Sequence, residues 1–179
     1  SSPKLCWLHG RGSVFVPAPL AAEISQNQNP SHTMQLSAYV RIVPITTLAQ
    51  GAAGQTQIVS SIVDTQSFAS GLFIVPVGTI TAGGEQSLKL EHSDAADMSG
   101  AKPVAYSNQV VLDADSGTVR YIDVRRFGRR YVRLTINRAT QNSSFGPVVC
   151  QLYEAVAAPT SHAAGVTGEV LPSAGDGYA

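Results

Sequence analysis

Three segments near the carboxyl end decide the fold of this 179-residue chain: TVRYIDVR at residues 118–125, RYVRLTIN at 130–137 and PVVCQLYEAV at 147–156. Each is rich in β-branched and other apolar residues, in alternating or nearly continuous positions, which is typical of strands. A tight turn at residues 126–129 separates the first two segments. The sequence therefore predicts a hairpin over residues 118–137 and a last strand that closes the domain.

Several earlier segments carry the same kind of pattern. They are MQLSAYVRIVPIT at 34–46, TQIVSSIVD at 56–64, FASGLFIVPVGTI at 68–80, SLKLEHS at 87–93 and AYSNQVVLD at 105–113. Pro44 lacks a backbone donor, so the end of the first segment should be a sheet edge or a bulge. In SLKLEHS the alternation predicts that Leu88, Leu90 and His92 point inward.

The pattern of many short strands, separated by turn signals and without a helical apolar stripe, predicts an all-β fold. An antiparallel β-sandwich is the architecture that fits it. The strand number and loop lengths favour a jelly-roll-like sandwich over an immunoglobulin-like one, and the Cys-Trp-Cys spacing of antibody domains is absent.

The two ends of the chain differ in composition from the middle. Residues 1–33 are irregular and rich in Gly, Pro and polar residues, and they are expected to form an extended N-terminal arm. Residues 34–156 form the predicted sandwich. Residues 157–179 are mostly Ala, Gly, Pro and Ser, which predicts a flexible C-terminal arm. Arms of this kind become ordered when they lie on neighbouring subunits.

Overall composition narrows the function classes. Hydrophobic residues make up 44% and charged residues only 13%, and the formal net charge is zero. A general nucleic-acid binder is usually basic, so direct nucleic-acid binding is not expected. No apolar run is long enough for a membrane helix, and no signal peptide is visible, so we expect synthesis in a cytoplasm. Cys6 and Cys150 could be free thiols or one disulfide.

Residues that could carry catalysis do not form a recognisable site. The histidines stand alone in their segments, and the serines lack a nucleophile elbow. The acid pairs Asp94/Asp97 and Asp113/Asp115 lie in turn-like contexts, where solvated carboxylates are common. The sequence therefore predicts no catalytic, cofactor or metal residues and no enzyme. A small hydrolase would need a pocket lined by two of His92, Asp94 and Asp97.

Arginines are concentrated in one region. Seven of the 12 Lys and Arg residues lie between Arg120 and Arg138. Like charges at this density repel unless carboxylates, carbonyls or phosphates neutralise them, and the guanidinium fork suits contacts across a subunit boundary. A solvated basic turn and nucleic-acid contact are the alternatives. The predicted protein-contact residues are Trp7, Phe15, Arg125, Arg126, Arg129 and Arg130.

The order of features from Asp64 to Glu154 resembles a diffuse family of tailed-bacteriophage virion proteins. Members carry a VGTIT strand, a strand end of the form LExSD, and an ID-(V)-RR … RYVRL hairpin. The residues that show the similarity most clearly are Glu91-His92-Ser93-Asp94 and Tyr131-Val132-Arg133-Leu134.

This resemblance implies a capsid decoration or cement protein on the virion surface. Its partner would be the major capsid protein, and a homo-oligomer such as a trimer would be expected. A structural protein of the tail, baseplate or head-fibre base is an alternative within the virion. A carbohydrate-binding β-sandwich is an alternative from another class, although aromatic residues make up only 7% of the chain.

Overall fold

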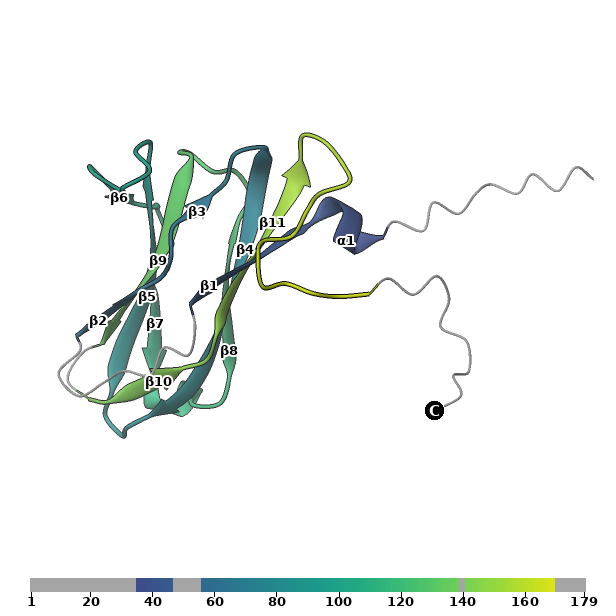
Figure 1. Ribbon diagram of the computed structural model, residues 1–179. Helices are drawn as coiled ribbons and strands as arrows, with labels where there is room; N and C mark the ends of the chain where they lie inside the picture. Colours follow the sequence, from purple (N-terminus) through teal and green to yellow (C-terminus); the bar gives the residue numbers. More distant parts are fainter. Residues whose placement is uncertain (1–34, 47–55, 139–140, 170–179) are drawn as a thin grey trace, which may run out of the picture. The chain divides into compact units, whose positions relative to one another are not determined.

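The computed structural model describes residues 35–46, 56–138 and 141–169, and it confirms an all-β sandwich (Figure 1). The strands of sheet 1 are β1 (Arg41–Thr46), β4 (Phe68–Ile80), β8 (Val119–Val124), β10 (Ser143–Phe145) and β11 (Val148–Ala155). The strands of sheet 2 are β2 (Gln57–Val59), β3 (Val63–Asp64), β5 (Glu85–Ser93), β6 (Lys102–Pro103), β7 (Gln109–Leu112) and β9 (Tyr131–Arg138). The short helices are α1 (Leu36–Tyr39) and the 3-10 turn η1 (Asp113–Asp115).

All strand pairs are antiparallel. In sheet 1, β11 lies between β1 and β4, β10 pairs with the end of β4, and β8 pairs with β4 as well. In sheet 2, β9 lies between β5 and the short strands β2 and β3, while β6 and β7 pair with the far side of β5.

The core lies between the two sheets. In β4 the alternation sends Phe73, Val75 and Val77 inward, and all three are buried. Leu88 and Leu90 of β5 are fully buried opposite them, which confirms the predicted alternation of that strand. The burial pattern changes at the end of the strand, where His92 is half-buried and Ser93 is buried and donates a hydrogen bond to the Ser99 carbonyl. His92 does keep the inward parity of Leu90, since it lies opposite the buried Val132 of β9, but at the end of the strand its side chain is not fully enclosed.

The predicted hairpin over residues 118–137 is wrong. Both of its strands exist, but β8 pairs with β4 in sheet 1 and β9 pairs with β5 in sheet 2. The residues between them cross from one sheet to the other. Phe127 anchors this crossing, because its ring packs against the core and its backbone N–H donates to the Ala69 carbonyl at 2.9 Å. Alternation had identified the strands, but it carries no information about which strand each one pairs with.

The amino-terminal part of the sandwich is less regular than the alternating sequence pattern predicts. Leu36 to Tyr39 form a helical turn rather than strand, and β1 begins only at Arg41. The expectation for Pro44 is confirmed, since β1 is an edge strand whose register shifts between Pro44 and Thr46. The segment 56–64 is broken into β2 and β3 at Ser60, whose hydroxyl accepts the Leu134 N–H.

The chain beyond β11 turns back along the outer edge of β1. Thr160 donates its N–H to the Ala38 carbonyl at 2.9 Å and its hydroxyl to the Val40 carbonyl at 3.0 Å. Ala163 N–H donates to the Ile42 carbonyl at 3.1 Å. The first part of the predicted C-terminal arm therefore satisfies backbone groups of β1, and it covers an edge that would otherwise be open to other strands.

Candidate interaction surface

The outer face of sheet 1 carries an unusually apolar row of side chains. The strand registers align Pro44 with Val149, Val149 with Ile74, and Ile74 with Tyr121. This row crosses β1, β11, β4 and β8 without a charged or amide side chain. Directly opposed residues on one face of a sheet have adjacent side chains, so the row forms one continuous apolar strip.

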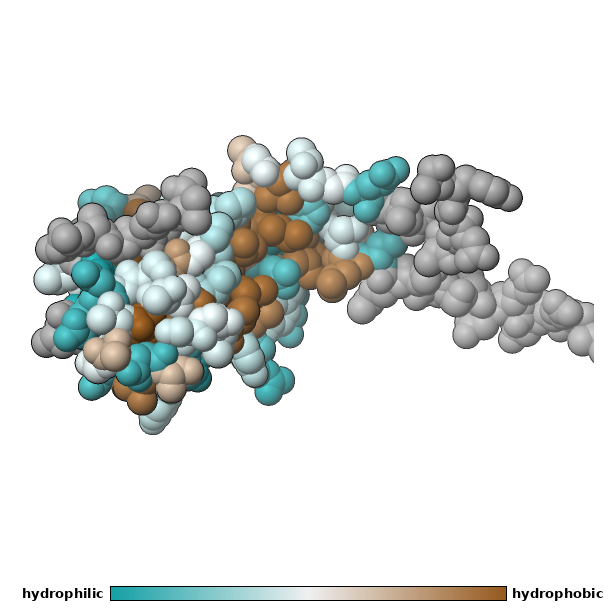
Figure 2. All heavy atoms as spheres, turned by 90° about the horizontal axis from the view of Figure 1, so that it is seen from below, coloured by the Kyte–Doolittle hydropathy of each residue, from teal (hydrophilic) through white to brown (hydrophobic). Residues whose placement is uncertain are grey.

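The neighbouring positions extend this strip. Leu72 and Pro76 flank Ile74 on β4, and Val119 lies opposite Pro76 with 59% of its surface exposed. The row through Leu72 is mixed, since Leu72 lies opposite Gln151 and Asp123, and the Asp123 carboxylate accepts a 2.6 Å hydrogen bond from the Tyr153 hydroxyl. Figure 2 shows the apolar residues, in brown, gathered along the side of the molecule where sheet 1 and α1 lie. We call this surface, made of the outward residues of sheet 1, the apolar face.

The outer face of sheet 2 differs because it carries a cluster of charged side chains. Glu91 lies between two cations there, with Lys89 Nζ and the Arg133 guanidinium each at 2.8 Å. The hydrogen bond from Lys89, followed by that from Arg133, lowers the pKa of the Glu91 carboxyl despite its partial burial. Such a surface is well solvated. Val59, Val110 and Leu112 are also exposed on sheet 2. The two outer faces differ because the charged cluster at Glu91 interrupts sheet 2, whereas the row from Pro44 to Tyr121 on sheet 1 contains no charged side chain.

The four predicted contact arginines lie together in the crossing between β8 and β9, but they fall into two kinds. Arg129 binds Asp94 at 2.7 Å. Arg130 binds both carboxylate oxygens of Asp64 at 2.8 Å and stacks over the Tyr131 ring. Within the described residues, Arg125 and Arg126 are exposed and make no ion pair. Of the four, these two are therefore the arginines that no described carboxylate neutralises.

The Asp64–Arg130 pair predicts an acid-sensitive contribution to stability. The hydrogen bond from Arg130 lowers the pKa of Asp64 below its value in the unfolded chain. The unfolded state therefore binds the proton first, so this contribution is present above about pH 4 and is lost as the pH falls through the folded-state pKa. In Asp64→Asn, thermal unfolding should depend less on pH between neutrality and about pH 3.

A control for this titration is Glu85→Gln, because Glu85 is exposed and has no ion pair within the described residues. It should leave the acid dependence of the melting temperature unchanged. An Asp64→Asn variant with the full wild-type acid dependence would contradict the assignment.

Arg138 belongs to the arginine-rich region of the sequence, but its side chain lies inside the molecule. It shares the inward parity of Val132, Leu134 and Ile136 on β9 and is only 6% exposed. Its guanidinium donates to the Ser143 hydroxyl at 3.2 Å and to the Asn142 amide oxygen at 3.1 Å. This inward position was not predicted, although the alternation of β9 is a sequence signal for it.

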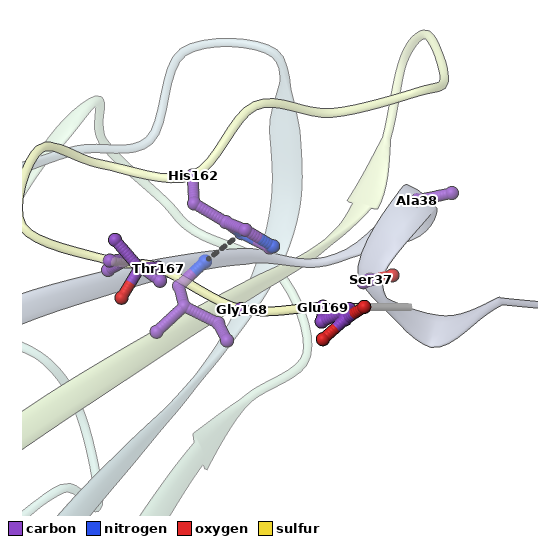
Figure 3. A pocket seen from close by; sticks show the side chains of 8 residues that line it. Ser37, Ala38, His162, Thr167, Gly168 and Glu169 are labelled. Carbon is purple, nitrogen blue, oxygen red and sulfur yellow. Dashed lines mark hydrogen bonds between the residues drawn. The ribbon is translucent and has the colours of Figure 1, made fainter. Parts of the chain in front are cut away.

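A small pocket of about 330 Å³ lies between α1, β1 and the returning tail (Figure 3). Its wall includes Ser37, His162 and Glu169, which are residue types found in hydrolases. In this arrangement the Ile42 N–H donates to His162 Nδ1 at 3.2 Å, so that nitrogen carries no proton and is not oriented by a carboxylate. Within the described residues no hydrogen bond joins the three side chains, so the pocket lacks the connected nucleophile, base and orienting acid of such enzymes.

Asp94 and Asp97, two of the other residues named as possible catalysts, are held by partners of other kinds. Asp94 binds Arg129, and Asp97 accepts the Ser99 N–H at 2.9 Å, which lowers the pKa of Asp97. Burial and the nearby Arg129 charge lower the pKa of His92. No cluster of three metal-ligating side chains occurs in the described ranges, and no helix there is long and apolar enough to span a membrane.

The remaining predicted residues divide between the core and the undescribed part of the chain. Cys150 is a free, fully buried thiol, and burial raises its pKa to about 12, which makes it a poor nucleophile. Trp7, Phe15 and Cys6 lie outside the described residues.

The apolar face was not predicted from the sequence, although a signal for it existed. The segment FASGLFIVPVGTI is apolar at both parities, and a strand with that pattern is covered on both faces. One face of β4 meets the core, so the apolar residues of the other parity lie on the outer face of sheet 1.

No family model matches the chain, and no curated protein gives a significant match.

Proposed function

We propose that this chain is a structural protein of a virus particle, a cement or decoration protein that binds the capsid shell through the apolar face. The observation that carries the proposal is the difference between the two outer faces of the sandwich. Sheet 2 presents the charged Lys89–Glu91–Arg133 cluster, while sheet 1 presents the row from Pro44 to Tyr121. The similarity to phage virion proteins in residues 64–154 supports the choice of the major capsid protein as partner.

The order of the strands supports the jelly-roll form of the sandwich. If β2 with β3, β6 with β7, and β10 with β11 each count as one broken strand, both sheets become four strands wide. The order is then β1, β11, β4, β8 in sheet 1 and β2, β9, β5, β7 in sheet 2. Connections between sheets of this kind define jelly rolls, which recur in viral capsid domains and in lectins.

The size of the apolar face sets the strength of the binding. Four strands spaced by about 4.8 Å, with six residues of about 3.3 Å each, cover roughly 400 Å² of flat area. A standard interface buries about 800 Å² of accessible surface on each partner, so one copy should bind weakly. Many copies on one shell, or an oligomer that contacts several coat subunits, would add these weak contacts by avidity.

Arg125 and Arg126 extend the proposed contact. They project from the crossing beside the apolar face without an internal ion pair among the described residues. Acidic groups on a coat subunit would complement them, and charge pairs at the rim of an interface mainly affect its orientation and rate of association.

Co-sedimentation with empty capsid shells tests the proposal. Wild-type protein should pellet with shells, and Ile74→Lys should reduce the bound fraction about tenfold or more, because it buries an unpaired charge in the contact. Val59→Lys is the matched control, since Val59 is an exposed valine of β2 in sheet 2. Circular dichroism would establish that both variants are folded.

Two results would contradict the proposal. One is wild-type protein that does not bind shells, and the other is Ile74→Lys that binds them as well as wild type. Glycan binding lost in a Tyr121→Ala variant would favour the carbohydrate-binding alternative. Electron microscopy of labelled particles would distinguish the capsid surface from the tail, baseplate or head-fibre base.

A further inference from the structure

Among the residues that the structure describes, the sheet edges of this sandwich are short or covered in all but one place. The edge of sheet 1 at β1 is covered by the tail through Thr160 and Ala163. In sheet 2 both edges consist of short strands, β2 and β3 on one side and β6 and β7 on the other. Short or covered edges are the usual ways by which proteins prevent unwanted strand pairing.

The exception is β8. It is six residues long, and among the described strands it pairs only with β4. The Thr118 carbonyl accepts the Val77 N–H, so by alternation Arg120 and Ile122 also direct their backbone groups toward β4. The backbone groups of Val119, Tyr121 and Asp123 must then face outward. One of them has a partner, since the Gln109 side chain donates to the Tyr121 carbonyl at 2.9 Å.

The uncovered edge of β8 is also apolar. Val119 and Tyr121 are 59% and 64% exposed, and both belong to the apolar face. With Gln109 and Arg120 they line an open groove of about 360 Å³ beside the strand. A long, exposed and apolar edge strand is a template for another strand.

We propose that β8 pairs with β8 of a second copy of this chain, in antiparallel orientation about a two-fold axis at Tyr121. Tyr121 then lies opposite its counterpart, and Val119 lies opposite Asp123 of the other copy. The residues with outward backbone groups exchange N–H···O bonds, and the Gln109 side chain moves off the Tyr121 carbonyl. The two four-strand faces merge into one continuous apolar surface.

The charges of β8 favour a second copy as the occupant. Arg120 is neutralised by Asp115 at 2.5 Å, and the Asp123 carboxylate is bound by the Tyr153 hydroxyl. In the two-fold register Arg120 faces Ile122, and Asp123 faces Val119, so no like charges meet. A symmetric edge pair is self-complementary by geometry, and it needs no second kind of surface. Shell binding is not required for this contact, although the pair would present twice the apolar face to a shell.

Sedimentation velocity over a concentration series tests the self-association in the full-length chain. Wild-type protein should form dimers, and Tyr121→Lys should weaken the dimer at least about tenfold, because two ammonium groups would face each other at the axis. Ile62→Lys is the control, since Ile62 is an exposed apolar residue between β2 and β3 and should leave dimerisation unchanged.

Cross-linking tests the register. Paired residues in this arrangement have Cα atoms about 5.5 Å apart, within the range of a disulfide. In a Cys6→Ser background, Tyr121→Cys should oxidise to a covalent dimer, while Val59→Cys should remain monomeric under the same conditions. A monomer at every concentration, or a trimer that Tyr121→Lys leaves intact, would overturn the inference. Neither result would affect the shell-binding measurement with Ile74→Lys, which is made separately.

Discussion

Phe73→Ala is expected to lower the free energy of unfolding by about 3–5 kcal/mol. Phe73 is completely buried at the centre of β4, where the register places it between Cys150 of β11 and Ile122 of β8. Removing the ring leaves a cavity that three paired strands cannot close without distortion. Domains are stable by about 5–15 kcal/mol, so the variant should be marginally folded, as urea titration followed by circular dichroism would show.

The neighbouring residue provides a sharp control. Ile74 occupies the same strand but points to the apolar face, where it is half-buried. Ile74→Ala should cost about 1–2 kcal/mol, because only part of its surface leaves water on folding. Equal losses at the two positions would contradict the assignment of inner and outer faces in β4.

Gly71→Val is expected to destabilise the protein by about 1–3 kcal/mol through overpacking. A Cβ atom on Gly71 would lie 2.6 Å from the Phe127 ring and 3.2 Å from a methyl group of Leu152. The ring is the end of a side chain and can move, but its movement would detach the crossing between β8 and β9 from sheet 1. Thermal and urea unfolding would measure the loss.

The contact between Gly71 and Phe127 also predicts non-additivity. Phe127→Ala removes the ring, so the double variant Gly71→Val/Phe127→Ala should be more stable than the sum of the two single losses predicts. Gly168→Val is the matched control, because a Cβ there has no atom within 4 Å. Its stability should remain within about 0.5 kcal/mol of wild type. Strict additivity in the double variant would show that the ring and the glycine do not compete for space.

The crossing between β8 and β9 links the two sheets of the sandwich. Phe127 fixes its middle, while Arg130 fixes its far end to Asp64. Arg125 and Arg126, which have no internal ion pair among the described residues, are thereby presented from a rigid support. A rigid presentation lowers the entropic cost of binding for long side chains, which is consistent with the proposed role of these two arginines.

The amino-acid sequence by itself determined the class of the fold and part of the core. Alternation identified β5, β8, β9 and β11, and it placed Leu88 and Leu90 inside. Pro44 marked an edge because a residue without an N–H cannot occupy the middle of a sheet. These properties depend on a residue and its near neighbours, so they can be read from a single strand.

Only the tertiary structure decided which strands are partners and which face remains apolar. The segments 118–125 and 130–137 look like a hairpin locally, yet β8 pairs with β4 and β9 pairs with β5, so long-range pairings place them in different sheets. The row from Pro44 to Tyr121 joins residues that are distant in the sequence, and it exists only because the registers of β1, β11, β4 and β8 coincide. The position of the tail on β1 is decided in the same way, since it depends on an edge that no local pattern reveals.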